Sequence, residues 1–166
     1  MQKLCTLVLF LAATTVAASA QVPTKGNVFF GYAYNHVEVV SNNGINTNGW
    51  DAQLEGNFLP WIGIVGDIGA TYGSHVGEHN YLFGPRVSVR VERFRPFAEF
   101  LIGASHINVN SGEATDTSFA NALGGGIDYQ IAGPVSLRGQ LDWIHTRFFS
   151  DHQNDVRFAT GVTFHF

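Results

Sequence analysis

The sequence has one cysteine, few charged residues and no long apolar run beyond its first 20 residues. The cysteine, Cys5, lies in the apolar N-terminal segment, so we expect neither disulfides nor thiol chemistry in the rest of the chain. Charged residues make up 13% of the sequence, about half of the roughly 25% that is typical of soluble domains. Nine Lys and Arg stand against thirteen Asp and Glu without a basic cluster, which argues against a nucleic-acid partner.

The first 20 residues have the form of a secretory signal peptide. Lys3 precedes an apolar run from Leu4 to Ala13, and the small residues Ala18 and Ala20 mark a cleavage site. We therefore predict a signal peptide over residues 1–20 and a mature domain over residues 21–166. No later run approaches the roughly 18 apolar residues of a membrane helix. For an exported chain that is rich in aromatics and poor in charge, a closed β-barrel is the remaining way to occupy a bilayer.

Apolar and polar residues alternate along eight segments, which is the period of a β-strand. Residues 49–60 show it most clearly, with the first series apolar or small and the second polar: Trp50, Ala52, Leu54, Gly56 and Phe58, against Asp51, Gln53, Glu55 and Asn57. The other segments are 28–37, 61–72, 81–91, 96–106, 118–130, 135–146 and 157–166. In the segment 96–106, Phe97 and Leu101 interrupt the pattern.

The connections between these segments alternate in length. Short turns are expected at 59–61, 92–95 and 131–134, and longer polar loops at 38–48, 73–79, 108–118 and 147–154. This pattern is typical of outer-membrane barrels, whose turns are periplasmic and whose longer loops are extracellular. The sequence predicts an all-β fold, an eight-stranded antiparallel up-and-down transmembrane β-barrel with both termini in the periplasm.

A soluble lipocalin-like barrel is the alternative, but its lumen would be apolar and its outside polar. Here the polar residues share one face with nearly all the strand glycines. A face of small and charged residues suits the crowded interior of a narrow barrel, which leaves the face rich in Phe, Tyr, Ile and Val for lipid.

The sequence resembles the OmpA-like family of small outer-membrane β-barrels, found in Gram-negative bacteria. The segments that carry the resemblance are FFGYAY at 29–34, FGPRVS at 83–88, PFAEFLIGASH at 96–106, GGGIDYQI at 124–131, LRGQLDWIHTRF at 137–148, and the final Phe166. The resemblance implies an outer-membrane location in contact with outer-membrane lipid. It also implies insertion by the barrel-assembly machinery, which reads a C-terminal strand ending in an aromatic residue. The residues that match this signal are Phe158, Val162, Phe164 and Phe166. Larger members add a peptidoglycan-binding domain, which we do not expect here because the sequence stops at the barrel.

Charged residues on the inward face are expected to form an ion-pair network in the lumen, because charges enclosed in a narrow interior must be paired. The predicted members are Asp51, Glu55, Asp67, Arg86, Arg90, Glu99, Asp128, Arg138, Asp142 and Arg157. The same residues could instead line a polar channel and set its ion selectivity. We favour a plugged lumen over a pore, since eight strands leave an interior barely wide enough for side chains.

The remaining candidate chemistry is weak. Ser105 and His106 are adjacent, so a strand sends them to opposite faces and they cannot act as nucleophile and base, and His145 has no serine in its own segment. His75, His79 and His152 could meet at the extracellular rim, although loop histidines without fixed spacing more often face water than bind zinc. We therefore predict no catalytic site, metal or cofactor, and a monomer with a structural or surface-interaction role. The alternatives are a narrow pore for small solutes or, with less support, a lipid-modifying enzyme. The loops do not identify a ligand.

Overall fold

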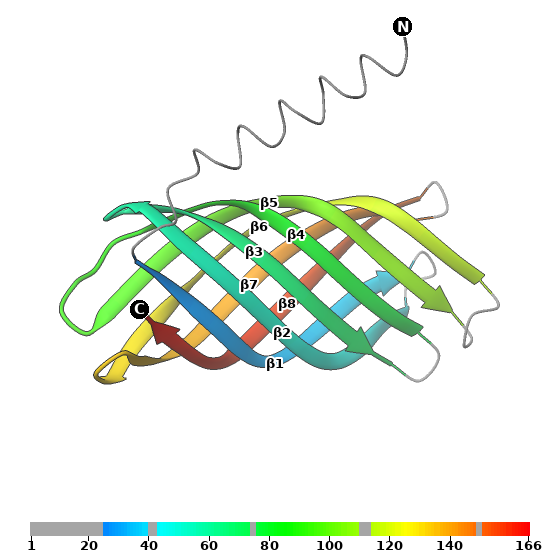
Figure 1. Ribbon diagram of the computed structural model, residues 1–166. Coiled ribbons are helices and arrows are strands. Elements are labelled where there is room, and N and C mark those ends of the chain that lie inside the picture. The colour runs from blue at the N-terminus through cyan, green and yellow to red at the C-terminus, as the bar shows by residue number, and fades with distance from the viewer. Residues whose placement is uncertain (1–24, 40–42, 74–75, 110–113, 149–150) are drawn as a thin grey trace, which may run out of the picture.

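A computed structural model describes residues 25–39, 43–73, 76–109, 114–148 and 151–166. These residues form one closed antiparallel barrel of eight strands (Figure 1), which confirms the predicted fold. The strands are β1 (Gly26–Val39), β2 (Asn43–Leu59), β3 (Ile62–Tyr72), β4 (Val76–Ser88), β5 (Phe94–Val109), β6 (Ala114–Ala132), β7 (Val135–Phe148) and β8 (Asp151–His165). No helix among the described residues is long and apolar enough to cross a membrane. The predicted signal peptide over residues 1–20 lies outside the described residues.

Each strand pairs with its neighbours in sequence, and β1 and β8 close the barrel. The β1–β8 register runs from Asn27 opposite His165 to Val37 opposite Asp155. Beyond it, Gly26 and Phe166 exchange two backbone hydrogen bonds, with both N···O distances 3.0 Å. Closure leaves no strand edge unpaired, which a bilayer requires because lipid offers no partner for backbone groups.

Both ends of the described chain lie at the same end of the barrel as the β2–β3, β4–β5 and β6–β7 connections (Figure 1). This end is called the terminal end below, and the opposite end the loop end. Residues 60–61, 89–93 and 133–134 connect strands at the terminal end. Gly133 has a φ of 51° in one of these turns, a left-handed conformation that glycine adopts without steric cost.

The strands extend further toward the loop end than predicted. The pattern predicts loops at 38–48, 73–79, 108–118 and 147–154, yet β1 continues to Val39, β4 begins at Val76 and β5 continues to Val109. The expected contrast between long and short connections is therefore largely absent. The backbone groups of these polar residues are hydrogen-bonded between paired strands. A polar composition is therefore not enough to distinguish a loop from the end of a hairpin.

The outer surface of the barrel is covered by large apolar side chains. Phe30, Leu54, Phe119 and Leu123 are 58–63% exposed, while their neighbours in sequence point inward and are buried or partly buried. This arrangement is the reverse of a soluble barrel and matches the predicted lipid-facing series.

An apolar cluster fills part of the lumen between β3 and β7. Its members are Val65, Leu82, Leu101, Ala120, Ala122 and Ile144. Leu101 and Phe97 are buried, on the same inward series as Glu99 and Ser105. The prediction that these two residues interrupt the alternation is wrong, because they are lumen-facing core residues in an interior that is partly apolar.

Candidate functional site

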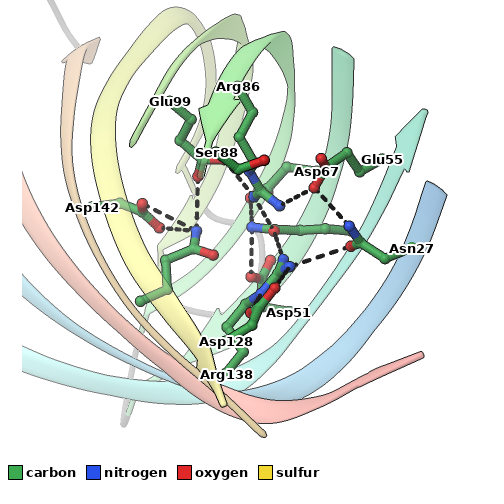
Figure 2. Close-up of polar contacts among 12 residues, drawn as sticks. Asn27, Asp51, Glu55, Asp67, Arg86, Ser88, Glu99, Asp128, Arg138 and Asp142 are labelled. Atoms are coloured by element: carbon green, nitrogen blue, oxygen red, sulfur yellow. Dashed lines mark hydrogen bonds and ion pairs between the residues drawn. The ribbon is translucent and has the colours of Figure 1, made fainter. Parts of the chain in front are cut away.

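Charged side chains from opposite walls of the barrel meet in its interior (Figure 2). Arg86 on β4 lies between Glu55 on β2 and Glu99 on β5, donating from Nη1 to Glu55 at 2.9 Å and from Nε to Glu99 at 2.7 Å. Arg95 on β5 donates from Nη2 to the other Glu55 oxygen at 2.6 Å. The side chains of Arg86, Glu55 and Glu99 are fully buried, so these pairs bind three strands together inside the lumen.

The guanidinium of Arg138, on β7, spans the barrel toward β2. Its Nε and Nη2 donate to the two oxygens of Asp128 at 2.6 and 2.9 Å, and its Nη1 donates to Gln53 Oε1 at 2.9 Å. The guanidinium also lies over the Phe97 ring, 4.7 Å from its centroid, and Arg86 lies over the same ring at 4.2 Å. A buried aromatic face attracts a cation, so Phe97 contributes to the network as well as to the core.

The guanidinium of Arg157, on β8, contacts three carboxylates. Its Nη2 donates to Asp67 at 2.6 Å and to Asp142 at 2.9 Å, and its Nη1 lies 3.4 Å from Asp51 Oδ1. Asp142 is the cross-strand neighbour of Arg157, whereas Asp51 and Asp67 come from β2 and β3. Arg157 therefore connects the last strand to the second and third strands through the lumen.

The structure places nine of the ten predicted network residues in these ion pairs, and the exception is Arg90. Arg90 is exposed, follows the end of β4, and forms no ion pair among the described residues. It lines a cavity of about 810 Å³ at the terminal end together with Lys25 and Arg95. The prediction for Arg90 is wrong because β4 ends at Ser88. Beyond that residue the chain no longer alternates between lipid and lumen, so the position of Arg90 in the series does not direct its side chain into the lumen.

Sequence reasoning missed several polar residues of the lumen. Arg95 was assigned to a turn, but β5 begins at Phe94 and buries Arg95 against Glu55. Gln53 and Gln140 fall on the inward series of their predicted strands but were not predicted as members of the network; both are buried, and Gln140 donates to Glu99 at 2.9 Å. Glu78, assigned to a loop, is buried on β4. Extending the period of two backward from Arg86 reaches Glu78, so the alternation itself held this signal.

Four histidines lie near the loop end on the outward series of their strands: His36, His79, His106 and His145. The Nδ1 atoms of His36, His106 and His145 lie within 2.6–2.9 Å of side-chain oxygens on Asn46, Thr117 and Asn154. His79 and His106 are cross-strand partners. Ser105, in contrast, is buried in the lumen, which places it and His106 on opposite faces as expected.

No group of three or more His, Cys, Asp or Glu side chains is arranged to hold a metal ion in the part of the chain that the structure describes. His75, one of the three loop histidines considered above, lies outside the described residues, and so does the side chain of His152.

The residues of the predicted assembly signal lie on the outward series of β8 and at its end. Phe158, Val162, Phe164 and Phe166 are all exposed, and Val162 and Phe164 are paired with Phe30 and Val28 of β1. They therefore form part of the apolar outer surface at the seam where the barrel closes.

An apolar outer wall, a polar interior and a closed ring of antiparallel strands define a transmembrane β-barrel. The sequence matches the outer membrane protein beta-barrel domain family over residues 5–166, and the chain belongs to this family. It is thus an outer-membrane β-barrel protein, as the resemblance in the sequence implied.

Solved structures with the same fold include three small outer-membrane barrels. Neisserial surface protein A aligns with a TM-score of 0.72 and 9% identity, covering 84% of this chain and 96% of that one. Ail, the attachment invasion locus protein of Yersinia pestis, aligns with a TM-score of 0.62 and 14% identity, and the alignment covers 86% of this chain and 98% of Ail. The N-terminal barrel domain of Pseudomonas aeruginosa OprF aligns with a TM-score of 0.54 and 13% identity, and the alignment covers 85% of this chain and 99% of that domain. At sequence identities this low, the structural alignments show a common fold and nothing further. No curated protein matches in sequence.

Proposed function

We propose that this protein is a plugged outer-membrane barrel with a structural or surface-interaction role, and that it does not conduct solutes. The observation that carries the proposal is the set of buried guanidiniums that cross the lumen: Arg157 contacts Asp67 and Arg138 contacts Gln53, each on a distant strand. The side chains of Arg86, Arg138 and Arg157 are no more than 1% exposed. Opening a path would separate buried ion pairs, which is costly because each leaves an uncompensated charge.

The proposal includes an export route and an orientation. Cleavage after Ala20 would release the mature barrel from residues 1–20, and the barrel-assembly machinery would insert it by recognising Phe158, Val162, Phe164 and Phe166. The terminal end would face the periplasm, because the polar hairpin ends lie at the loop end, and outer-membrane barrels extend their polar segments on the extracellular side. The outer wall would contact lipid as a monomer, and the loop end would present any surface contacts.

A narrow pore for small solutes is the principal alternative, and conductance distinguishes the two. We expect native protein in planar lipid bilayers to remain closed at moderate voltage, because buried side chains and ion pairs cross the lumen between opposite walls. Refolded protein should first show the heat-dependent gel migration of a folded barrel, so that silence reflects a closed lumen. A steady, cation- or anion-selective open state would contradict the proposal and support the pore.

The proposal also excludes enzymatic activity on lipid. Ser105 is buried in the lumen while His106 lies outside and contacts Thr117, so this pair cannot share a proton during nucleophilic attack. Release of fatty acid from outer-membrane lipid by the refolded protein would contradict this part of the proposal.

A further inference from the structure

Buried carboxylates outnumber buried guanidiniums in the lumen. Besides Asp155, which is also buried, the described lumen residues include seven buried carboxylates and four guanidiniums. The acids are Asp51, Glu55, Asp67, Glu78, Glu99, Asp128 and Asp142, and the bases are Arg86, Arg95, Arg138 and Arg157. Isolated charges are unstable in an interior of low dielectric constant, so the excess negative charge is neutralised either by protons or by a bound cation.

The imbalance is confined to the half of the lumen nearest the loop end. Toward the terminal end, Arg86 and Arg95 balance Glu55 and Glu99, and Arg138 balances Asp128. Toward the loop end, a single guanidinium, that of Arg157, contacts three aspartates. Beyond it lies Glu78, which forms no ion pair with any described residue. His165 does not alter this balance, since its Nε2 lies 4.0 Å from Asp128 at the terminal end.

Neutral polar side chains surround the Glu78 carboxylate. Asn35 on β1 reaches across the lumen and donates from Nδ2 to Glu78 Oε2 at 3.1 Å, while Ser105 Oγ donates to Oε1 at 2.9 Å. Asn80, two residues further along β4, lies on the same inward series as Glu78. All four residues are at most 1% exposed. The donors from Asn35 and Ser105 are neutral, and the carboxylate forms no ion pair with any described residue.

Oxygen atoms without hydrogen-bond partners lie in the same region. Asn35 Oδ1, Asn80 Oδ1 and Thr71 Oγ1 are buried and accept or donate no hydrogen bond in the described residues. Thr71 is the cross-strand partner of Glu78 and is 2% exposed, so its hydroxyl shares the lumen-facing side of the pair. A buried oxygen without a hydrogen-bond partner is costly, and the three residues that carry these atoms are neighbours of Glu78 by contact, by strand pairing or by sequence.

We propose that this cluster binds one hard cation, Ca²⁺, with Glu78 as its charged ligand and Asn35, Asn80 and Thr71 as neutral oxygen ligands. Ca²⁺ is coordinated by carboxylate, amide and other oxygens together with water, which matches this set of donors. A proton on Glu78 would satisfy one of the unpartnered oxygens, whereas a cation satisfies several and also compensates the aspartates around Arg157. The site lies near the start of β4, within a few residues of the loop end.

Calorimetric titration of the folded full-length barrel in detergent, at constant ionic strength and neutral pH, tests the proposal. We expect one saturable Ca²⁺ site with a Kd of about 10⁻⁴–10⁻³ M, the weak end of the range for protein Ca²⁺ sites. Glu78→Gln should weaken binding about tenfold or more, because ligand charge sets Ca²⁺ affinity. Glu92→Gln is the matched control: Glu92 is exposed in the 89–93 connection, and its change should leave binding unaltered.

Thr71→Val provides a second variant that preserves side-chain shape and keeps the proposal testable if Glu78→Gln does not fold. It should weaken Ca²⁺ binding while the protein retains the heat-dependent migration of a folded barrel. Absence of a saturable site in native protein would show that protons neutralise the acids and would overturn the proposal. Native-like Ca²⁺ binding by Thr71→Val and by folded Glu78→Gln would also overturn it.

Discussion

Replacing Arg157 by methionine is expected to lower the free energy of unfolding by about 3–5 kcal/mol, the usual effect of breaking a buried ion pair. Methionine replaces the aliphatic part of the arginine side chain and has no charge, so the packing close to β8 is largely kept. The loss arises because Asp51, Asp67 and Asp142 would then lie close together without their common partner. Urea unfolding of protein refolded into lipid vesicles measures the effect.

Two further variants test this explanation. Arg93→Met makes the same change at an exposed arginine between β4 and β5, and should alter stability by no more than about 0.5 kcal/mol. Adding Asp67→Asn and Asp142→Asn to Arg157→Met removes two of the stranded charges and should recover much of the loss. If Arg157→Met is as stable as native protein, the three contacts do not form the ion-pair cluster described.

The second large effect is expected on assembly in cells, from Phe166→Ala. Phe166 pairs with Gly26 through its backbone and exposes its ring on the outer wall. Alanine keeps the backbone pairing but removes the aromatic group that the proposed assembly signal requires. We expect a several-fold lower amount of heat-modifiable barrel in the outer membrane, measured by fractionation and gel migration.

The matched control is Phe94→Ala, which removes an exposed aromatic at the start of β5 without touching β8. It should assemble nearly normally. Refolding of both variants into vesicles without other proteins should be similar, because loss of one exposed ring costs each barrel a comparable contact with lipid. Normal insertion of Phe166→Ala in cells would remove the support for this residue as an assembly signal.

The barrel was predictable from the sequence because each strand must alternate between lipid and lumen, and this constraint leaves a period of two along the chain. Pairing partners followed from the up-and-down order. The lumen acids and arginines were predictable for the same reason: Asp51, Glu55 and Arg86 fall on the inward series of clear strands.

The errors occurred where strands end and where the lumen is apolar. β4 ends and β5 begins a few residues earlier than the pattern predicts. As a result Arg95, expected in a turn, lies in the lumen, and Arg90, expected in the lumen, is exposed. Polar hairpin ends resembled loops, and so concealed Glu78. Phe97 and Leu101 seemed misplaced only because a narrow polar interior was expected, whereas cation contacts and an apolar cluster both occur there. Sequence periodicity cannot show which inward residues meet across the lumen.

The central claim, that side chains fill the lumen, is tested most directly by the reactivity of an introduced cysteine. The only native cysteine lies at position 5, within the predicted signal peptide, so the mature barrel offers a background free of thiols. Ala122→Cys places a thiol in the apolar cluster of the lumen, and Thr115→Cys places one at an exposed position on β6. A water-soluble thiosulfonate is added to each folded barrel. The account predicts rapid modification of Thr115→Cys, and modification of Ala122→Cys only after unfolding; equal rates in the folded barrels would contradict it.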